Sequence, residues 1–417
     1  MTQRTVAVIG AGVVGMMAAS YLQRDGHHVV VIDPQAPGSG ASSGNAGCLS
    51  PSSIVPMSGP AMLRSIPNWL ADPDGPLSIR WSYLPRLAPW LLRFLQAGRA
   101  GSLDKRAAAL LSLIGPCMAN LRPLLDDARR ADLIRSDGSL IVYRTARGWE
   151  GDREGRELRR RNGIGWQEVE RDALLDFDPH LTQDVFRAIF FDGNGHCVDP
   201  QKLVETLSEA LARNGGAIIR DRAIGFEMKG GRLAAVRTNS GSVPAAAAVL
   251  AAGAFSKDLA REAGNKVPLE TERGYHAMLK LPAFAPRLPT VDADTKIVAT
   301  PMAQGVRFAG VVEFAGLSAP PDWRRAKSIL ALGEVLYPGI SSMSAPDDIL
   351  FWMGHRPSCP DSLPVIGRSR RSPDIVLAFG HGHLGLTAAP MTGRIVADLV
   401  MGRPPPIELA AFSPDRF

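Results

Sequence analysis

Cysteine is scarce in this sequence, since the 417 residues include only four. Cys48, Cys117, Cys197 and Cys359 lie far apart, and no two of them have the C-x-x-C spacing. A zinc site or a disulfide framework would need close, repeated cysteine spacings. The sequence therefore indicates free thiols, as in a reducing cytoplasm, and no metal centre.

Long hydrophobic runs are also missing. The most apolar window, from Val243 to Phe255, is well short of the about twenty residues that cross a bilayer, and it contains Pro244 and Gly253. The apolar run at the amino terminus is interrupted at once by a glycine turn and lacks the cleavage site of a signal peptide. We expect a cytoplasmic protein without a membrane-spanning helix.

A strong charge of one sign is lacking as well. Lys and Arg number 47 and Asp and Glu 41, which gives a formal net charge of +6. This diffuse excess does not indicate a nucleic-acid-binding protein, and the sequence shows no motif for one. It suits an anionic cofactor, an acidic substrate or an anionic membrane face. With 45% hydrophobic and 21% charged residues, the chain is long enough for two globular domains.

The most informative stretch that is present runs from Thr5 to Asp33. It begins with a strand, Val6 to Ile9, followed by the spacing G-x-G-x-x-G. In this spacing Gly10 allows a tight turn, Gly12 lets the backbone approach a pyrophosphate, and Gly15 lets the next helix pack closely. The acid that ends the stretch follows a second strand, where it can accept hydrogen bonds from a ribose hydroxyl. The whole stretch is typical of a dinucleotide-binding β-α-β unit.

The loop that follows this unit bears on which dinucleotide is bound. The helix from Val13 to about Arg24 points its amino end at the pyrophosphate of either NAD or FAD. After Asp33, however, the loop from Pro34 to Pro51 is rich in Gly, Ser and Ala. Such a loop can lie against a flat ring system, whereas a plain NAD-binding domain normally continues into another helix. The loop therefore favours FAD.

A segment rich in Pro, Trp and Arg follows, from Pro51 to about Ala100. Its prolines are expected to limit helices to short pieces. Two interpretations stay open for its aromatic and basic residues: an amphipathic surface for anionic lipid or a partner, and ordinary core aromatics with solvated arginines, which we favour. The residues concerned are Trp69, Trp81, Trp90, Arg80, Arg86, Arg93 and Arg99.

The remainder of the chain alternates between two characters. Leu103 to about Arg135 is predicted to be helical, with two prolines that kink or split it. Near residue 196 the nucleotide-binding pattern returns, with a helix begun by Asp199 and Pro200. Residues from about 266 to 351 hold several strand candidates and predict an antiparallel sheet with covering helices. From about 354 onward, glycine turns, a strand and a closing helix complete the chain.

These pieces together resemble the FAD-dependent D-amino acid dehydrogenases, within the larger D-amino acid oxidase and glycine oxidase group. The similarity covers nearly the whole chain. The segments that carry it are Gly10 to Gly15 with Asp33, SSGNAGCLSP (Ser42 to Pro51), VDP (Val198 to Pro200), VLAAGAFS (Val249 to Ser256), RGYH (Arg273 to His276), ATPM (Ala299 to Met302), WMGHRPSCPDSLPVIG (Trp352 to Gly367) and GHGHLGLT (Gly380 to Thr387).

The resemblance implies an α/β fold in which a Rossmann-type FAD-binding domain is assembled from discontinuous segments, beside an α+β substrate domain with an antiparallel sheet. We expect residues 1–58, 195–266 and 355–417 in the first domain and 59–194 and 267–354 in the second. It implies a noncovalent FAD with Val198 near its adenine end and the last helix aimed at the flavin. The residues expected at the cofactor are Gly10, Gly12, Val14, Gly15, Asp33, Ser42, Ser43, Asn45, Ala46, Gly47, Leu49, Val198, Ala252, Gly253, Gly382, His383, Leu384, Gly385, Leu386 and Thr387.

Catalytic candidates follow from the same resemblance. Oxidation of an amino acid requires its carboxylate to be clamped so that the Cα–H lies over flavin N5. Arg356 is the expected clamp, because a guanidinium offers a fork matched to a carboxylate. Tyr275 is the second candidate, through its hydroxyl, and His383, with His381 nearby, is expected to take a proton or line the pocket. For the side-chain pocket we expect the segment from 57 to 90, Met302, Gln304 and Glu313.

The expected activity is therefore oxidative deamination of a D-amino acid, or of a cyclic one such as a hydroxy-D-proline, by hydride transfer to FAD. The imine is then hydrolysed to a 2-oxo acid, and the flavin is reoxidised by an acceptor such as a quinone. The alternatives are a flavin amine oxidase acting on glycine, sarcosine or another secondary amine, and a non-catalytic flavoprotein subunit. Oligomerisation and peripheral contact with the inner membrane stay open.

Overall fold

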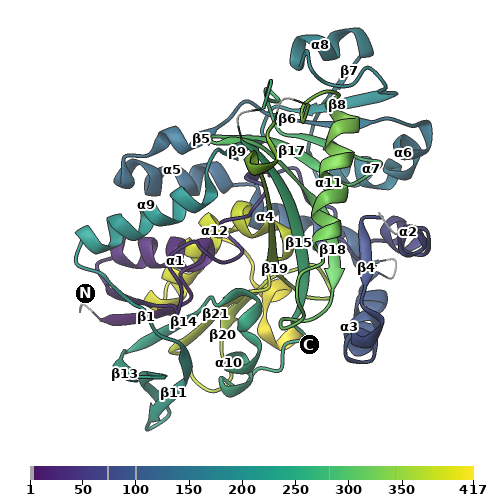
Figure 1. Ribbon diagram of the computed structural model, residues 1–417. Helices are drawn as coiled ribbons and strands as arrows, with labels where there is room; N and C mark the ends of the chain where they lie inside the picture. Colours follow the sequence, from purple (N-terminus) through teal and green to yellow (C-terminus); the bar gives the residue numbers. More distant parts are fainter. Residues whose placement is uncertain (1–3, 73–74, 99–100, 281, 343) are drawn as a thin grey trace.

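Two large sheets organise the computed structural model, which describes residues 4–72, 75–98, 101–280, 282–342 and 344–417. Arg99 of the sequence analysis lies outside these residues. Figure 1 shows one sheet in the lower left of the molecule and the other in the upper right. The first sheet has the strand order β10 (Ala217–Ile219), β2 (His28–Ile32), β1 (Thr5–Ile9), β14 (Ala247–Leu250), β21 (Ile375–Phe379) and β20 (Val365–Arg368).

The strands of this sheet are apolar on both faces, as expected of a parallel sheet covered on both sides. All its pairings are parallel except that of β20 with β21. Alternate residues of each strand enter different cores, so that Val6 and Val8 pack with the helices while Ala7 and Ile9 pack with the opposite layer. The helical layer consists of α1 (Val13–Arg24), α9 (Pro200–Arg213) and α12 (Gly385–Met401).

The opposite layer is a small antiparallel sheet and a short helix. Its elements are β11 (Ala223–Lys229), β12 (Arg232–Thr238), β13 (Gly241–Pro244) and α10 (Lys257–Glu262). Because the large sheet draws its strands from three separated stretches of sequence, the discontinuous Rossmann-type fold predicted from the sequence is confirmed. The domain boundaries themselves stay a prediction.

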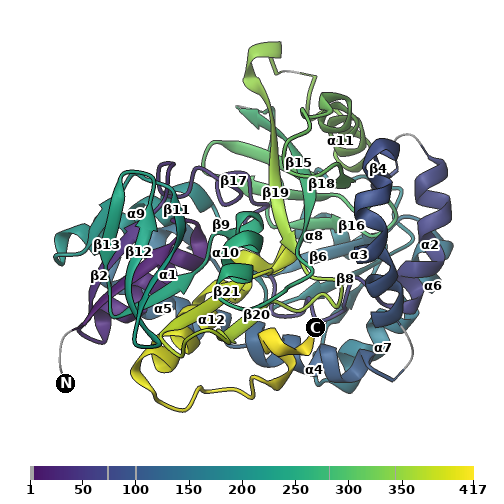
Figure 2. The ribbon, with the colours of Figure 1, turned by 90° about the horizontal axis from the view of Figure 1, so that it is seen from below.

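Among the described residues, the second sheet has nine strands. Most of its pairings are antiparallel, but β16 with β6 and β4 with β18 are parallel. Helix α11 (Trp323–Leu336) packs against the strands β15 and β18 (Figure 2). The strands are β19 (Ile349–Ser358), β15 (Glu270–Lys280), β18 (Gly305–Phe314), β17 (Val298–Met302), β16 (Thr290–Asp292), β6 (Ser139–Tyr143), β8 (Arg187–Phe191) and β7 (Gln167–Val169), with β4 (Leu77–Ile79) at β18.

A fourth sheet, of three strands among the described residues, connects the parts of the molecule. It pairs β3 (Cys48–Leu49) with β9 (Gly195–Cys197) and β9 with β5 (Ile134–Arg135). It therefore fixes the end of the glycine-rich loop after β2. The short helices α6 (Ala146–Gly151), α7 (Arg153–Arg161) and α8 (Leu174–Phe177) lie in the segment that also holds β6 to β8.

The proline-rich segment forms longer helices than expected. It consists of α2 (Pro60–Ala71), β4 and α3 (Leu84–Ala97), with Pro67 inside α2 and Pro89 inside α3. The prediction of only short helical pieces is therefore wrong here. Tertiary packing accounts for this, because Trp90 and Phe94 of α3 are buried in a cluster with Phe314 of the second sheet.

The predicted helix after residue 103 is split at Gly115 and Pro116 into α4 (Leu103–Ile114) and α5 (Cys117–Ala128). Among the described residues, two helical stretches are long and apolar enough to cross a membrane by length and composition, 103–128 and 382–401. The most apolar window of the first is 39% buried inside the protein and that of the second 78%. Both supply side chains to the core beneath the first sheet, as core helices do.

Candidate active site

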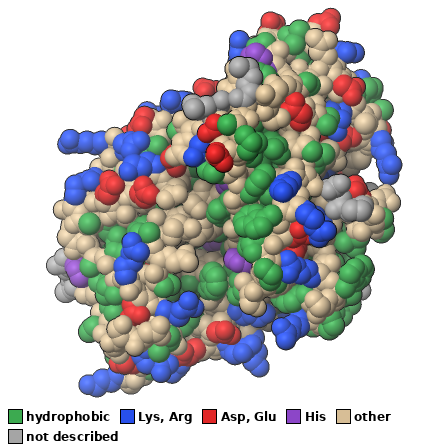
Figure 3. All heavy atoms as spheres, viewed as in Figure 1, with side chains coloured by type: hydrophobic (Ala, Val, Ile, Leu, Met, Phe, Trp, Pro, Cys, Tyr) green, Lys and Arg blue, Asp and Glu red, His purple; other side chains and the backbone are tan. Residues whose placement is uncertain are grey.

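A cavity of about 1410 Å³ runs from the glycine turn after β1 to the second sheet and the helices α2 and α3. Figure 3 shows this side of the molecule hollowed near its centre, with hydrophobic side chains gathered beside the hollow. Most residues expected at the cofactor line this cavity: Gly10, Gly12, Val14, Asp33, Ser42, Asn45, Ala46, Ala252, Gly253, Gly382, His383, Leu384, Gly385, Leu386 and Thr387.

The glycine turn is shaped by contacts that exclude side chains. Gly10 has φ +110, and a Cβ there would lie 2.5 Å from the carbonyl oxygen of Ala251. A Cβ at Gly15 would overlap the carbonyl oxygen of Gly10, so α1 packs on the turn only with glycine at that position. The carboxylate of Asp33 accepts hydrogen bonds from the backbone N–H groups of Ala11 and Gln35, each at 2.8 Å. Asp33 therefore ties the turn to the end of β2 while it lines the cavity.

The amino end of α1 faces the same space. The backbone N–H of Val13 donates to Oγ of Ser42 at 3.0 Å, so the glycine-rich loop caps this helix. No acidic residue lies in the first turn of α1. The positive end of the helix dipole is therefore left for an anion.

The glycine-rich loop is held flat against the second sheet. A Cβ at Gly44 would overlap the indole of Trp352, and the Gly44 carbonyl accepts a hydrogen bond from Nδ1 of His276 at 3.0 Å. The imidazole of His276 stacks on the same indole, with ring centroids 5.1 Å apart. Arg307 of β18 donates to the carbonyl oxygens of Ser43 and Asn45. These contacts join the loop to the second sheet from both sides.

The amino end of α12 closes the cavity near these elements. A β-bridge joins Ser358, at the end of β19, to His381 just before the helix. Nε2 of His381 lies 3.0 Å from Oγ1 of Thr392, and burial lowers the pKa of this histidine to about 3. The His383 side chain is exposed to the cavity, where desolvation and the nearby Arg356 charge lower its pKa to about 4. Both histidines are therefore neutral at pH 7.

The strands β15 and β19 form three cross-strand pairs beside the cavity, and Glu272, Trp352, Gly354 and Arg356 of these pairs line it. In the register of these strands Glu272 lies opposite Arg356, Gly274 opposite Gly354, and His276 opposite Trp352. The two glycines leave a floor without side chains. A Cβ at Gly274 would overlap the Arg356 guanidinium, and a Cβ at Gly354 would overlap the Trp352 indole. Arg356 and Trp352 therefore lie along the sheet with the bare glycine pair beneath them.

The Arg356 guanidinium is anchored by backbone. Its Nη1 donates to the carbonyl oxygen of Val311 at 3.1 Å and its Nη2 to that of Gly310 at 3.4 Å. Burial lowers the pKa of Arg356, and the neighbouring Glu272 opposes that shift. The pKa of Glu272 is raised by its own burial, against a hydrogen bond from Ser358 and the Arg356 charge. Since a guanidinium has five N–H donors, donors are left over for a carboxylate.

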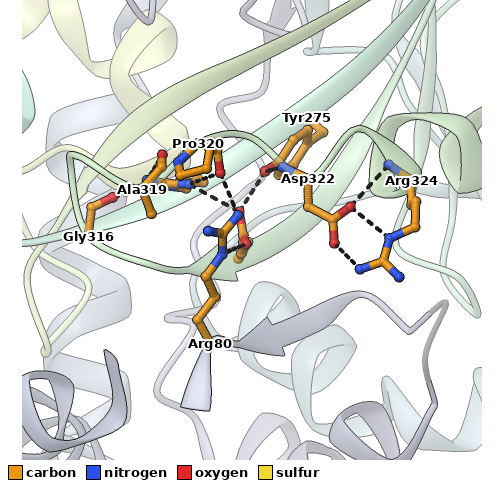
Figure 4. A network of polar contacts seen from close by, with 9 residues as sticks. Arg80, Tyr275, Gly316, Ala319, Pro320, Asp322 and Arg324 are labelled. Atoms are coloured by element: carbon orange, nitrogen blue, oxygen red, sulfur yellow. Dashed lines mark hydrogen bonds and ion pairs between the residues drawn. The ribbon is translucent and has the colours of Figure 1, made fainter. Parts of the chain in front are cut away.

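Tyr275 belongs to a different environment, shown in Figure 4. Because side chains alternate along β15, Tyr275 has the opposite parity to Glu272, Gly274 and His276. Its hydroxyl donates to Oε2 of Glu313 at 2.5 Å and accepts from the backbone N–H of Asp322 at 2.9 Å. The structure therefore does not bring this hydroxyl to Arg356, although the residue borders the cavity. The Tyr275 hydroxyl hydrogen, which the sequence analysis expected at the substrate carboxylate, is donated to Glu313 instead.

Glu313 is the centre of that environment. Its carboxylate accepts from Nε of Arg80 at 2.8 Å and lies 3.4 Å from Nη1 of Arg273. Arg273 is fully buried and also donates to the backbone carbonyls of Gly316, Ala319 and Pro320. Glu313, expected at the side-chain pocket, is thus a buried ion-pair partner that attaches the segment of β4 to β18.

Five expected cofactor residues lie away from the large cavity. Gly15, Gly47 and Leu49 pack in the turn and around β3. Ser43 and Val198 line a second cavity of about 270 Å³, together with Met302, Gln304 and Arg307. The large cavity is also lined by Arg222, just before β11, and by Ala223 and Ile224 at the start of β11, all of which the sequence analysis missed. Only the folded position of β11 reveals them.

The described residues fit FAD. The elongated cavity is bordered by the amino end of α1, which has no acidic residue in its first turn and suits a diphosphate. The Asp33 carboxylate suits a ribose, and the glycine-rich loop and the amino end of α12 suit an anionic ring system. Within the described parts of the chain, no group of three or more His, Cys, Asp or Glu side chains could hold a metal ion. All four cysteines are free. Fold and cavity thus define a flavin-dependent oxidoreductase.

Comparison with known proteins gives the family. Residues 5–399 match the DAO family of FAD dependent oxidoreductases, and the chain belongs to it. It is 41% identical over 417 residues to a D-amino-acid oxidase of Bradyrhizobium diazoefficiens, covering 99% of each chain. It is 32% identical over 422 residues to a D-amino acid dehydrogenase of Paramagnetospirillum magneticum, covering 99% of this chain and 98% of that one. Its fold matches glycine oxidase from Geobacillus kaustophilus with a TM-score of 0.74, 21% identity and 100% coverage of both chains.

Proposed function

We propose that this enzyme oxidises the Cα–N bond of D-amino acids, giving an imine that water hydrolyses to a 2-oxo acid. The observation that carries the proposal is the Arg356 guanidinium, anchored over the glycine floor in the same cavity as the dinucleotide turn. The names of the two relatives, an oxidase and a dehydrogenase of D-amino acids, support this substrate class.

FAD, when bound, accepts the Cα hydrogen as hydride and supplies the oxidising power. Two donors of the Arg356 guanidinium are bonded to the carbonyl oxygens of Gly310 and Val311, which fixes its orientation. The remaining donors would hold the substrate carboxylate in a two-bond fork. This orientation is stiff because the guanidinium lies on Gly274 and cannot sink further. The Trp352 indole covers Gly354 in the same way and lines the cavity beside the clamp.

The neutral groups around the clamp suit an amine that reacts in its uncharged form. His383 faces the cavity and is neutral at pH 7, so its unprotonated ring nitrogen can accept a hydrogen bond from the substrate amine. Glu272, opposite Arg356, is the other group that can do so. The residues proposed to hold FAD are those of the glycine turn, Asp33, the loop from 39 to 46 and the amino end of α12.

The acceptor that reoxidises the flavin belongs to the same proposal. We propose a quinone, and the exposed apolar side chains Trp81 and Leu95 at the cavity support peripheral contact with the membrane that would supply it. We therefore propose that the enzyme lies in the cytoplasm, at the inner face of the membrane that holds the quinone.

Anaerobic stopped-flow mixing of the FAD-loaded enzyme with matched D- and L-amino acids tests the proposal. We expect flavin bleaching by D-amino acids and little by their L-enantiomers, glycine or N-methylglycine. The reduced enzyme is then mixed with oxygen or a water-soluble quinone, and faster reoxidation by the quinone is expected. Bleaching by L-amino acids alone, or by glycine and N-methylglycine alone, would overturn the proposed function.

A further inference from the structure

We infer that the side-chain end of this cavity selects D-amino acids with long apolar side chains. The inference rests on the proposed function and goes further, because it names the subset of substrates. It comes from the composition of the wall that the segment from Met57 to Leu95 contributes.

Every described residue of this segment that lines the cavity is apolar. The segment is not apolar as a whole, since Arg80, Arg86 and Arg93 lie within it. None of these three arginines lines the cavity, and Arg80 is paired with Glu313 instead. The lining residues are Met57, Ile66, Trp69, Leu70, Pro76, Leu77, Ile79, Trp81, Leu84, Trp90, Leu91, Phe94 and Leu95.

This apolar wall begins beside the proposed clamp. Nε1 of Trp90 donates to the carbonyl oxygen of Ser358 at 3.4 Å, two residues beyond Arg356 on β19. The Trp90 ring lies 5.3 Å from that of Phe314 and stacks on Phe94 at 5.2 Å. Phe314 is on β18, three residues after Val311, whose carbonyl holds Arg356. A carboxylate on Arg356 therefore leaves the rest of the molecule next to these aromatic rings.

The charges close to the clamp are accounted for by the amino acid's own main chain. Arg356 would take the carboxylate, and Glu272 and His383 line the cavity near it and would be free to meet the amine. The other basic residues that the second sheet and its turns bring to the cavity, Lys296 and His355, lie outside the wall from 57 to 95. A charged side chain directed at the wall from 57 to 95 would lose its hydration without gaining a partner. An apolar side chain would instead gain roughly a fourfold improvement in kcat/KM for each methylene buried.

A homologous series tests this directly. The kcat/KM of the FAD-loaded enzyme is measured with D-alanine, D-2-aminobutyrate, D-norvaline and D-norleucine, and with D-lysine, which has the length of D-norleucine plus a charge. We expect a rise of roughly fourfold per methylene and at least a hundredfold preference for D-norleucine over D-lysine.

Two neighbouring residues of α3 give a matched pair of variants. Leu91 lines the cavity, whereas Leu92 does not and is 61% exposed. Leu91→Ala should lower kcat/KM for D-norleucine about fivefold and leave D-alanine within twofold. Leu92→Ala should change neither value.

The outcomes separate the two proposals. If kcat/KM does not rise along the series, or if D-lysine and D-norleucine have equal kcat/KM, the proposed selectivity is overturned. The proposed oxidation of D-amino acids would be unaffected by that result. A flat series combined with competitive inhibition by an alkyl quinone would assign the wall to the electron acceptor and overturn the inference. Bleaching by none of the D-amino acids would overturn both.

Discussion

Arg356 is held in place by main chain rather than by an acid. Its two backbone acceptors, Val311 and Gly310, lie on the neighbouring strand β18, and no ion pair of 4.0 Å or less with Glu272 is present among the described residues. Val311 adopts φ +47, at the register shift between β15 and β18. This bulge turns a carbonyl toward the guanidinium, as bulges beside functional sites do.

Substitution of Arg356 tests the clamp. Arg356→Ala should lower kcat/KM for D-amino acids about a hundredfold or more, on the order of 3 kcal/mol, because it removes a charge-assisted fork from a desolvated site. Arg356→Lys should restore only part of this, since an ammonium lacks the planar fork. Steady-state kinetics and the affinity of a benzoate-like inhibitor are measured together and should fall in parallel.

The FAD content of both variants provides the control, and we expect it to match the wild type. Loss of bound FAD, or equal loss of activity toward an amine without a carboxylate, would show that Arg356 stabilises the fold instead.

At the residue scale, the sequence could indicate the groups but not their partners. Arg356 was predicted from its motif, whereas Glu272 was missed, because its position opposite Arg356 depends on the register of β15 and β19. Tyr275 lies in the same motif as His276, but strand alternation gives them opposite faces. Val198 was expected at the adenine end, and it lines the separate smaller cavity. Pairings between distant strands decide each of these positions.

At the scale of elements, the loop after β2 depends on a strand more than 250 residues away. The Arg307 side chain on β18 donates to two carbonyls of this loop, and burial lowers its pKa to about 10. The sequence predicted a loop rich in Gly, Ser and Ala that lies against a flat ring system. The second sheet holds the loop in place, and no local sequence pattern in the loop predicts this contact.

Removal of this anchor should weaken FAD binding. Arg307→Met keeps the apolar stem and deletes both hydrogen bonds, so we expect the Kd of FAD for apoprotein to rise at least tenfold. The Kd is measured by quenching of FAD fluorescence on titration with apoprotein. Arg187→Met, which removes a half-exposed pair with Glu168, is the control and should leave the Kd unchanged. An unchanged Kd in Arg307→Met would contradict the anchoring role.

On the scale of the whole molecule, the fold holds several histidines in the neutral form. Burial lowers the pKa of His196 to about 4, and that of His276 and His381 to about 3. In the unfolded chain these groups titrate near 6.5, so below that pH the unfolded state binds more protons. The contribution of these histidines to the free energy of unfolding is therefore fully present above about pH 6.5. It is lost as the pH falls toward 4, by at most about 1.4 kcal/mol per pH unit for each histidine.

His276→Asn isolates one of these contributions. The asparagine amide can donate to the Gly44 carbonyl as Nδ1 does, but it cannot take up a proton. We expect the Tm of the FAD-loaded variant to fall less steeply than that of the wild type between pH 7 and pH 5. Differential scanning fluorimetry measures this, with exchange of the exposed His28 for Asn as the control. Equal slopes in all three proteins would refute the assignment.

The architecture was largely predictable at this scale. The glycine turn, the closing helix and the return of nucleotide-binding segments identified the first sheet, because each is a local pattern with a known partner. The helices of the proline-rich segment were not predicted, since Trp90 and Phe94 are stabilised by contacts with β18 rather than by local propensity. Local signals define elements, and the cavity arises from contacts between elements.

The strand order of the first sheet also has a consequence for biosynthesis. The first strand ends at residue 9, its neighbour β14 begins at 247, and β21 begins at 375. A ribosome adding about 5–20 residues per second reaches β21 roughly 20–70 s after it has made β1. The amino end of α12 emerges later still. The nascent chain thus carries half of a nucleotide site while more than 350 residues are added after β1, and capture of the flavin has to await the synthesis of β21 and of the amino end of α12.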